Sequence, residues 1–99
     1  GRRRLVDIAR ALATQPWLLA LDEPAAGLSP AERAALADAL GRLVADGLGI
    51  VVVEHDLDFL ARFCSRGLCL DRGRVIAEAS FADLRLDPAV LTAYVGDAA

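Results

Sequence analysis

The sequence has 99 residues, of which 56% are hydrophobic, and its formal net charge is −3. This length predicts one domain or a piece of one, with enough apolar side chains to form a core. The longest apolar runs, residues 17–21 and 50–53, are far shorter than the roughly 20 residues of a membrane-spanning helix, and no signal peptide is predicted. The acidic balance argues against a nucleic-acid-binding surface. We therefore interpret the arginines at positions 2–4 as a solvated helix face.

Methionine and lysine are absent from the sequence. A chain that begins at Gly1 is therefore expected to be either processed or a fragment. Without lysine, residues 1–99 cannot contain a phosphate-binding loop of the G-x-x-x-x-G-K-[ST] type. Two cysteines, Cys64 and Cys69, together with one nearby histidine are too few for a four-ligand metal site. We expect both cysteines to be reduced, buried thiols.

The first half of the chain alternates helical and strand patterns. Apolar residues at positions 5, 8, 9 and 12 predict a helix that ends before Pro16. Residues 17–21 form an uninterrupted apolar run, which is typical of a parallel strand covered on both faces. A capping box at Ser29 and Glu32, with Pro30 at the first helical position, then predicts the start of a second helix. The buried stripe of that helix is predicted to consist of Leu36, Leu40, Leu43 and Val44. Residues 49–53 predict a second, β-branched strand.

The second half predicts shorter elements. Asp56 is expected to cap a helix that extends to about Cys64. The side chains of this helix predicted to face inward are Phe59, Leu60, Phe63 and Cys64. Residues 68–70 and 74–77 are predicted to form a hairpin around a turn at 71–73, and short helices are predicted to begin at Ser80 and Asp87. Because each of the first two strands is followed by a helix, the pattern indicates an α/β fold with a mostly parallel sheet flanked by helices.

Polar residues follow both predicted parallel strands at the edge of the sheet where ligands usually bind. Asp22 and Glu23 cannot both be buried unpaired. One carboxylate can hold Mg²⁺ through its waters, while the other polarises a water for attack on phosphorus. His55 can donate a hydrogen bond to a terminal phosphate oxygen. A solvated strand end and a structural histidine would explain the same residues. Gly1 precedes a helix whose N-terminus favours an anion.

Four motifs, in order and with matching spacing, resemble those of ABC-type ATPases. Residues 1–12 resemble the end of the signature motif and its helix, and residues 18–24 resemble Walker B with its adjoining catalytic glutamate. Residues 26–29 occupy the place of the D-loop, and residues 51–56 resemble the strand and switch histidine. The resemblance covers essentially all 99 residues, as the C-terminal part of one P-loop ABC ATPase domain that ends in a hairpin and short helices.

A finer resemblance is to the ATP-binding subunits of branched-chain amino acid importers. It rests on residues 23–32, 54–59 and 93–96. Urea and amide importers share parts of these patterns, so they remain alternatives for the cargo.

The resemblance implies a role for five residues. Asp22 would position Mg²⁺ through water, and Glu23 would be the general base. His55 would sense the γ-phosphate of ATP, while Gly1 would touch the ATP held by the opposite subunit of a head-to-tail dimer. Ser29 takes the last D-loop position, where many members of the family have Asp, which puts that dimer contact in doubt.

The resemblance also implies partners and a location. The subunit would bind membrane permease subunits and lie at the cytoplasmic face of the cell membrane. The Walker A loop and most of the signature motif would precede Gly1, so the isolated chain is expected to be inactive. Two alternatives remain. One is a non-catalytic remnant or interaction fragment. The other is a related ATPase of DNA repair or translation, which would carry long insertions near the signature that this sequence lacks.

Overall fold

The computed structural model describes residues 2–96, which divide between two compact units, Gly1–Phe63 and Cys64–Ala99. The elements of the first unit are α1 (Arg2–Ala13), β1 (Leu18–Asp22), α2 (Pro30–Ala45), β2 (Gly49–Val53) and α3 (Leu57–Ala61). Those of the second unit are β3 (Arg66–Asp71), β4 (Arg74–Ser80), α4 (Phe81–Leu84) and α5 (Pro88–Gly96). The predicted α/β class, with a parallel pair and a later hairpin, is confirmed.

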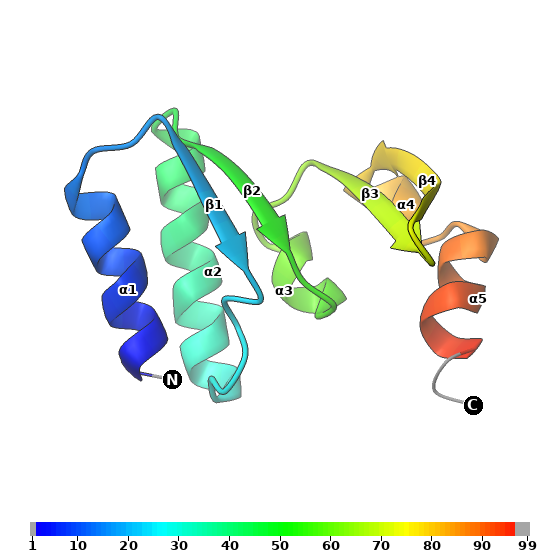
Figure 1. Ribbon diagram of the computed structural model, residues 1–99, viewed down its shortest axis with the longest axis horizontal. Helices are drawn as coiled ribbons and strands as arrows, with labels where there is room; N and C mark the ends of the chain where they lie inside the picture. Colours follow the sequence, from blue (N-terminus) through cyan, green and yellow to red (C-terminus); the bar gives the residue numbers. More distant parts are fainter. Residues whose placement is uncertain (1, 97–99) are drawn as a thin grey trace. The chain divides into compact units, whose positions relative to one another are not determined.

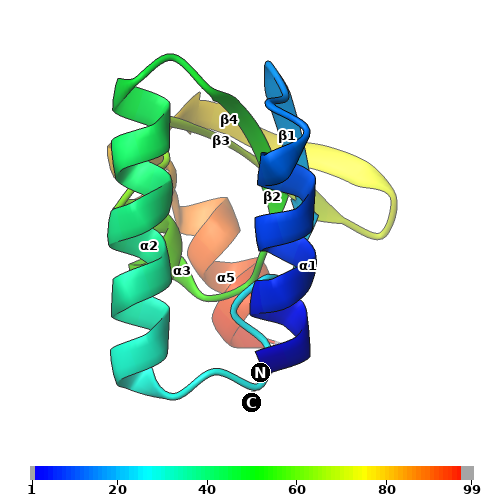
Figure 2. The same ribbon diagram turned by 90° about the vertical axis from the view of Figure 1, so that its left-hand side faces the viewer.

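In the first unit, β1 and β2 pair in parallel, from Leu18 opposite Gly49 to Asp22 opposite Val53. Figures 1 and 2 show α1 and α2 running in one direction and the two strands in the other, as a βαβ crossover requires. Both strands consequently end at the side of the unit where α2 and α3 begin (Figure 1). The residues that follow the two strands are therefore brought to the same edge, as the sequence predicts.

The core of this unit lies between the helices and one face of the sheet. Its buried apolar side chains come from α1, β1, α2, α3 and the loop after β1, and among the described residues they are Ile8, Leu19, Ala25, Leu28, Leu36, Ala37, Leu40, Phe59 and Leu60. Leu40 is only 1% exposed, and full burial of such a side chain contributes about 1.5–3 kcal/mol. The buried faces predicted for α1 and α2 are confirmed at their central residues and wrong at two positions. Ala9 is exposed and Val44, in the last turn of α2, is 39% exposed.

The other face of the β1–β2 pair is open among the described residues. Leu18, Val51 and Val53 are 43%, 57% and 62% exposed. Their register explains this, since alternate side chains on paired strands point to the same face. The prediction that these apolar strands are covered on both faces is therefore wrong for this chain. The first strand also begins one residue later than predicted, so that Trp17 lies before it and is 83% exposed.

The capping box of α2 is confirmed. The Ser29 hydroxyl accepts a hydrogen bond from the Glu32 N–H at 3.2 Å, and the Glu32 carboxylate accepts one from the Ser29 N–H at 3.0 Å. Pro30 occupies the first turn. The reciprocal bonds satisfy two N–H groups that would otherwise have no partner in the helix, and so they fix where α2 starts.

The helix after β2 is shorter than predicted. Asp56 caps it through a 3.0 Å bond from the Phe59 N–H, but α3 ends at Ala61 rather than near Cys64. The N–H groups of Arg62 and Phe63 bond to carbonyls three residues earlier, which tightens the chain out of the α-helix. The local sequence pattern therefore predicts the cap of α3 correctly, whereas the C-terminal end of α3 is determined by these tighter turns.

The second unit contains the predicted hairpin with longer strands than expected. β3 and β4 pair antiparallel around Arg72 and Gly73, whose φ angles of +51° and +78° suit the turn that joins twisted strands. α4 and α5 begin within one residue of the predicted positions, and the buried apolar residues in the described part of the unit are Phe81, Leu84 and Val90.

The two cysteines are free, as expected, but half-buried rather than buried. Burial raises the pKa of the Cys64 thiol above its ordinary value. Burial, followed by the carboxylates of Asp71 and Asp87, raises the pKa of Cys69. Both thiols are therefore disfavoured as thiolates, which are the reactive form.

Within residues 2–96, none of the helices is both long enough and apolar enough to cross a membrane.

Candidate functional site

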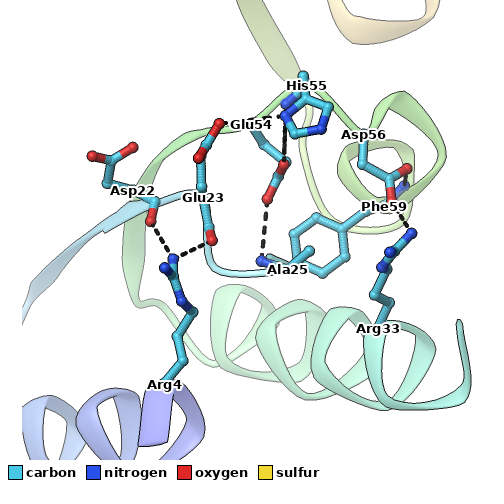
Figure 3. A network of polar contacts seen from close by, with 9 residues as sticks. All are labelled: Arg4, Asp22, Glu23, Ala25, Arg33, Glu54, His55, Asp56 and Phe59. Carbon is cyan, nitrogen blue, oxygen red and sulfur yellow. Dashed lines mark hydrogen bonds and ion pairs between the residues drawn. The ribbon is translucent and has the colours of Figure 1, made fainter. Parts of the chain in front are cut away.

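The chain leaves β1 through a residue in an unusual backbone conformation. Glu23 directly follows the last residue of β1 and has a φ angle of +48°, a region that residues other than glycine seldom adopt. Its N–H donates to the Val53 carbonyl at 2.8 Å, which extends the pairing of the strands by one bond. This turn directs the Glu23 side chain away from the strand and toward the end of β2 (Figure 3).

Arg4, from the first turn of α1, fixes the same point of the chain. Its guanidinium donates to the carbonyl oxygen of Asp22 at 2.8 Å and also to that of Glu23. The interpretation of the arginine cluster as a solvated face is therefore wrong for Arg4. A side chain with several donors can satisfy two carbonyls where the strand ends.

The residues after Glu23 are anchored in the core. Pro24 is among the most deeply buried side chains, and Ala25 is 4% exposed. Gly27 has a φ angle of +77°, which a residue with a Cβ rarely tolerates, and the loop then leads into the cap at Ser29. The Ser29 hydroxyl, which the resemblance places at the last D-loop position as a nucleotide-site residue, accepts the hydrogen bond of that cap.

His55 lies next to Glu23, as the sequence predicts. Its Nδ1 is 3.4 Å from Glu23 Oε1 and 3.5 Å from Glu54 Oε1. The His55 side chain is 73% exposed and that of Glu23 is 53% exposed, so both can reach a ligand at the edge of the sheet. An N–H at Nδ1 can donate to the carboxylate of Glu23, and Nε2 lies on the other side of the ring.

Asp22 occupies the carboxyl end of β1 with an exposed side chain that points away from Arg4 (Figure 3). A carboxylate in this place fits Mg²⁺, which takes one or two protein carboxylates and otherwise waters and phosphate oxygens. Among the described residues there is no group of three or more His, Cys, Asp or Glu side chains that could hold a metal. The predicted role of Asp22 through a bound water is compatible with that limit.

Gly1, predicted to touch ATP in the opposite subunit, lies outside the described residues.

Glu54 is a residue of the site for which the sequence predicts no role. Its side chain is 2% exposed and its carboxylate accepts hydrogen bonds from the N–H of Ala25 at 3.2 Å and from its neighbour His55 at 3.1 Å. An acidic residue between an apolar strand and a histidine is the signal that could have drawn attention to it.

Arg33 was also missed. Its guanidinium forms an ion pair with Asp56 at 3.3 Å and donates to the Leu28 carbonyl at 3.2 Å. Arg33 belongs to α2 and Asp56 caps α3, so this side chain links the start of α2 to the segment that carries His55. Its sequence position on a helix gives no signal of this contact.

Comparisons with known proteins agree with this geometry. No family model matches the chain. The chain is 36% identical over 97 residues to the lipopolysaccharide export system ATP-binding protein LptB of Acidithiobacillus ferridurans, covering 98% of the chain and 40% of that protein. It is 35% identical over 99 residues to the high-affinity branched-chain amino acid transport ATP-binding protein LivG of Salmonella typhimurium, covering 99% of the chain and 39% of that protein.

A crystal structure of the ADP conformation of an ATP-binding cassette of an ABC transporter superposes with a TM-score of 0.82 and 31% identity. The likeness covers 94% of this chain and 38% of that one. The chain is part of an ABC ATP-binding cassette fold. It spans well under half the length of these relatives. The relatives' names refer to different cargoes at nearly equal identity, so family likeness leaves the cargo of this cassette open.

Proposed function

We propose that the chain is the C-terminal part of an ATP-hydrolysing subunit that powers an ABC importer. The observation that carries this proposal is the 3.4 Å approach of His55 Nδ1 to Glu23 Oε1 at the ends of two adjacent parallel strands. The likeness to ATP-binding cassettes indicates that ATP is the nucleotide on which this pair would act.

In the proposed reaction, Glu23 is the general base. Its carboxylate accepts a proton from the water that attacks the γ-phosphorus, while the bond from that phosphorus to the bridging oxygen breaks and ADP leaves. The exposed side chain of Glu23 leaves room for the water. With an N–H on both ring nitrogens, His55 donates from Nδ1 to Glu23, which keeps the carboxylate at the reacting edge, and from Nε2 to a γ-phosphate oxygen. When bound, Mg²⁺ neutralises charge on the phosphates. Asp22 would hold that ion through one of its waters.

Two further residues would belong to the dimer. Gly1 would approach the ATP bound by the second subunit, and Ser29 would lie in the loop that faces that subunit. ATP would thus be held between two head-to-tail copies, each supplying part of the site. Permease subunits in the membrane would be the other partners, with the ATPase subunit peripheral on the cytoplasmic side.

The proposed cargo is a branched-chain amino acid. This proposal rests on residues 23–32, 54–59 and 93–96, which are similar to those of the corresponding importers. Urea and short amides are the alternative cargoes. Uptake of labelled leucine, in cells that carry the subunit with the permeases encoded beside it, distinguishes the two: leucine uptake supports the proposal, and urea uptake alone contradicts it.

The activity is tested in two steps. The coding sequence upstream of Gly1 is read for an in-frame phosphate-binding loop with its lysine, and the complete subunit is then purified and assayed for Mg-dependent ATP hydrolysis. Turnover supports the proposal. A stop codon upstream, or a complete subunit that binds ATP without hydrolysing it, favours the alternative of a non-catalytic remnant or interaction fragment.

A further inference from the structure

The side chain of Glu54 is far more buried than that of Glu23, at 2% exposed against 53%. Burying a carboxylate carries a large desolvation cost unless hydrogen bonds compensate for it. Glu54 has that compensation, because each of its two oxygens accepts a backbone N–H. Oε2 accepts from Ala25 and Oε1 accepts from His55 (Figure 3).

These two donors belong to different loops. Ala25 is 29 residues from Glu54 in sequence and only two residues after Glu23, whereas His55 follows Glu54 directly. One carboxylate therefore joins the backbone after β1 to the backbone after β2. Charge-assisted hydrogen bonds of this kind are stronger than bonds between neutral groups, and the bond from Ala25 is in addition partly buried, which reduces competition from water.

The backbone matters here because the two reacting side chains are themselves exposed. Glu23 is 53% and His55 is 73% exposed, so packing restrains neither side chain firmly. Their separation therefore depends on where their Cα atoms are held, and on the contact of His55 Nδ1 with Glu54 Oε1 at 3.5 Å. Glu23 is fixed by the bond from its N–H to Val53, and its loop is fixed again at Ala25 by Glu54.

The Arg33–Asp56 ion pair joins the same two segments farther out, but it is more open to solvent. Its side chains are 43% and 24% exposed, and ion pairs with such exposure contribute little. The buried Glu54 carboxylate is therefore the stronger of the two links.

We propose that Glu54 is a positioning residue that sets the distance between Glu23 and His55 by holding the Ala25 and His55 backbones together. The effect of Glu54 on catalysis rests on the proposed function, whereas its effect on the distance between Glu23 and His55 does not. Glu54 itself touches neither water nor nucleotide in this scheme.

The first test is Glu54→Gln in the complete subunit. Glutamine keeps the size of the side chain but has one acceptor oxygen, and its amide group would face one of the two N–H donors. We expect kcat to fall by up to about 100-fold, as for other small misplacements of reacting groups, with KM for ATP unchanged. Rates are expressed per subunit that binds ATP, so that a misfolded fraction cannot imitate the effect.

The matched control is Glu78→Gln, the same chemical change at an exposed position of β4. It should leave kcat and KM as they are. An unchanged kcat in Glu54→Gln, or a loss of the same size in both variants, overturns the proposal.

The second test requires no hydrolysis. In NMR spectra of the unaltered protein, a scalar coupling across the hydrogen bond should connect the Ala25 amide nitrogen to the Glu54 carboxyl carbon. The Ala25 and His55 amide protons should also exchange slowly with solvent. Absence of the coupling together with fast exchange overturns the proposal even if Glu54→Gln does not fold. If the unaltered subunit fails to hydrolyse ATP, the proposed function fails, and the NMR result still decides the role of Glu54.

Discussion

Glu23 has a backbone conformation that is uncommon for a residue with a side chain, and this conformation points its carboxylate toward His55. A left-handed φ costs about 1–3 kcal/mol and persists only where surrounding contacts impose it. The contacts here are the bond from the Glu23 N–H to Val53 and the bonds from Arg4 to the Asp22 and Glu23 carbonyls. The unusual backbone conformation and the hydrogen bonds that hold it are therefore both located at Glu23, the residue proposed as the general base.

Replacing Glu23 by Gln in the complete subunit should leave ATP binding intact and reduce turnover by about 10²- to 10⁴-fold, the usual contribution of a general base. Glutamine has the same size but cannot accept a proton at neutral pH. Single-turnover kinetics and nucleotide binding measure the two effects separately. Unchanged turnover would show that another group is the base.

His55→Ala should slow hydrolysis by about 10²-fold, the effect of losing one electrostatic donor in a site, with little loss of stability. The side chain is 73% exposed, so its removal creates no cavity in the core. The measurements are kcat and a thermal melt of the same preparation. A large fall in melting temperature would mean that His55 has a structural role instead.

At the scale of elements, the start of α2 was predictable and the extent of the neighbouring elements was not. The capping box is local, since Ser29 and Glu32 satisfy each other's backbone within one turn. The exposure of Val44 and the length of α3 depend on which other elements pack against these helices, and sequence periodicity does not contain that information.

Ser29→Ala should destabilise the complete subunit by about 1 kcal/mol, since it removes the acceptor of the Glu32 N–H. Ser29→Asp keeps an acceptor and should lose much less. Urea unfolding followed by circular dichroism gives both values, with Ser65→Ala as the same change at an exposed position of the second unit. Equal losses for Ser29→Ala and Ser29→Asp would mean that the cap is not what stabilises this end of α2.

At the scale of the whole molecule, the described chain leaves a large apolar surface exposed. Each sheet has two strands, and one face of the first presents Leu18, Val51 and Val53 to solvent. Two-stranded sheets are marginally stable in water by themselves, and exposed apolar strands favour aggregation.

The 99-residue chain in isolation should therefore melt over a broad temperature range and behave as partly molten. Circular dichroism during heating and the dispersion of amide signals in NMR spectra measure this. The fluorescence of Trp17, the only tryptophan and 83% exposed, should show the emission of a solvated indole. A sharp, cooperative melt with dispersed amide signals would contradict the prediction.

The isolated chain should also bind no Mg-ATP in the micromolar range. A lysine-bearing phosphate-binding loop supplies much of the contact to the nucleotide in P-loop enzymes, and the chain contains no lysine. Isothermal titration calorimetry of Mg-ATP into the chain measures this directly, with the complete subunit as the positive control. Micromolar affinity in the isolated chain would refute the expectation.

The sequence by itself determined the order of the elements, the caps at Ser29 and Asp56, and the meeting of Asp22, Glu23 and His55 at one edge. These follow from short-range rules: periodicity, capping, and the parallel pairing that brings strand ends together. Only the tertiary structure decided which strand face is open and what Arg4, Arg33 and Glu54 contact. The contacts of Arg4 with Asp22, Arg33 with Asp56 and Glu54 with Ala25 join residues 18, 23 and 29 positions apart in sequence. Such pairs meet only after the strands and helices have packed, so no local pattern records them.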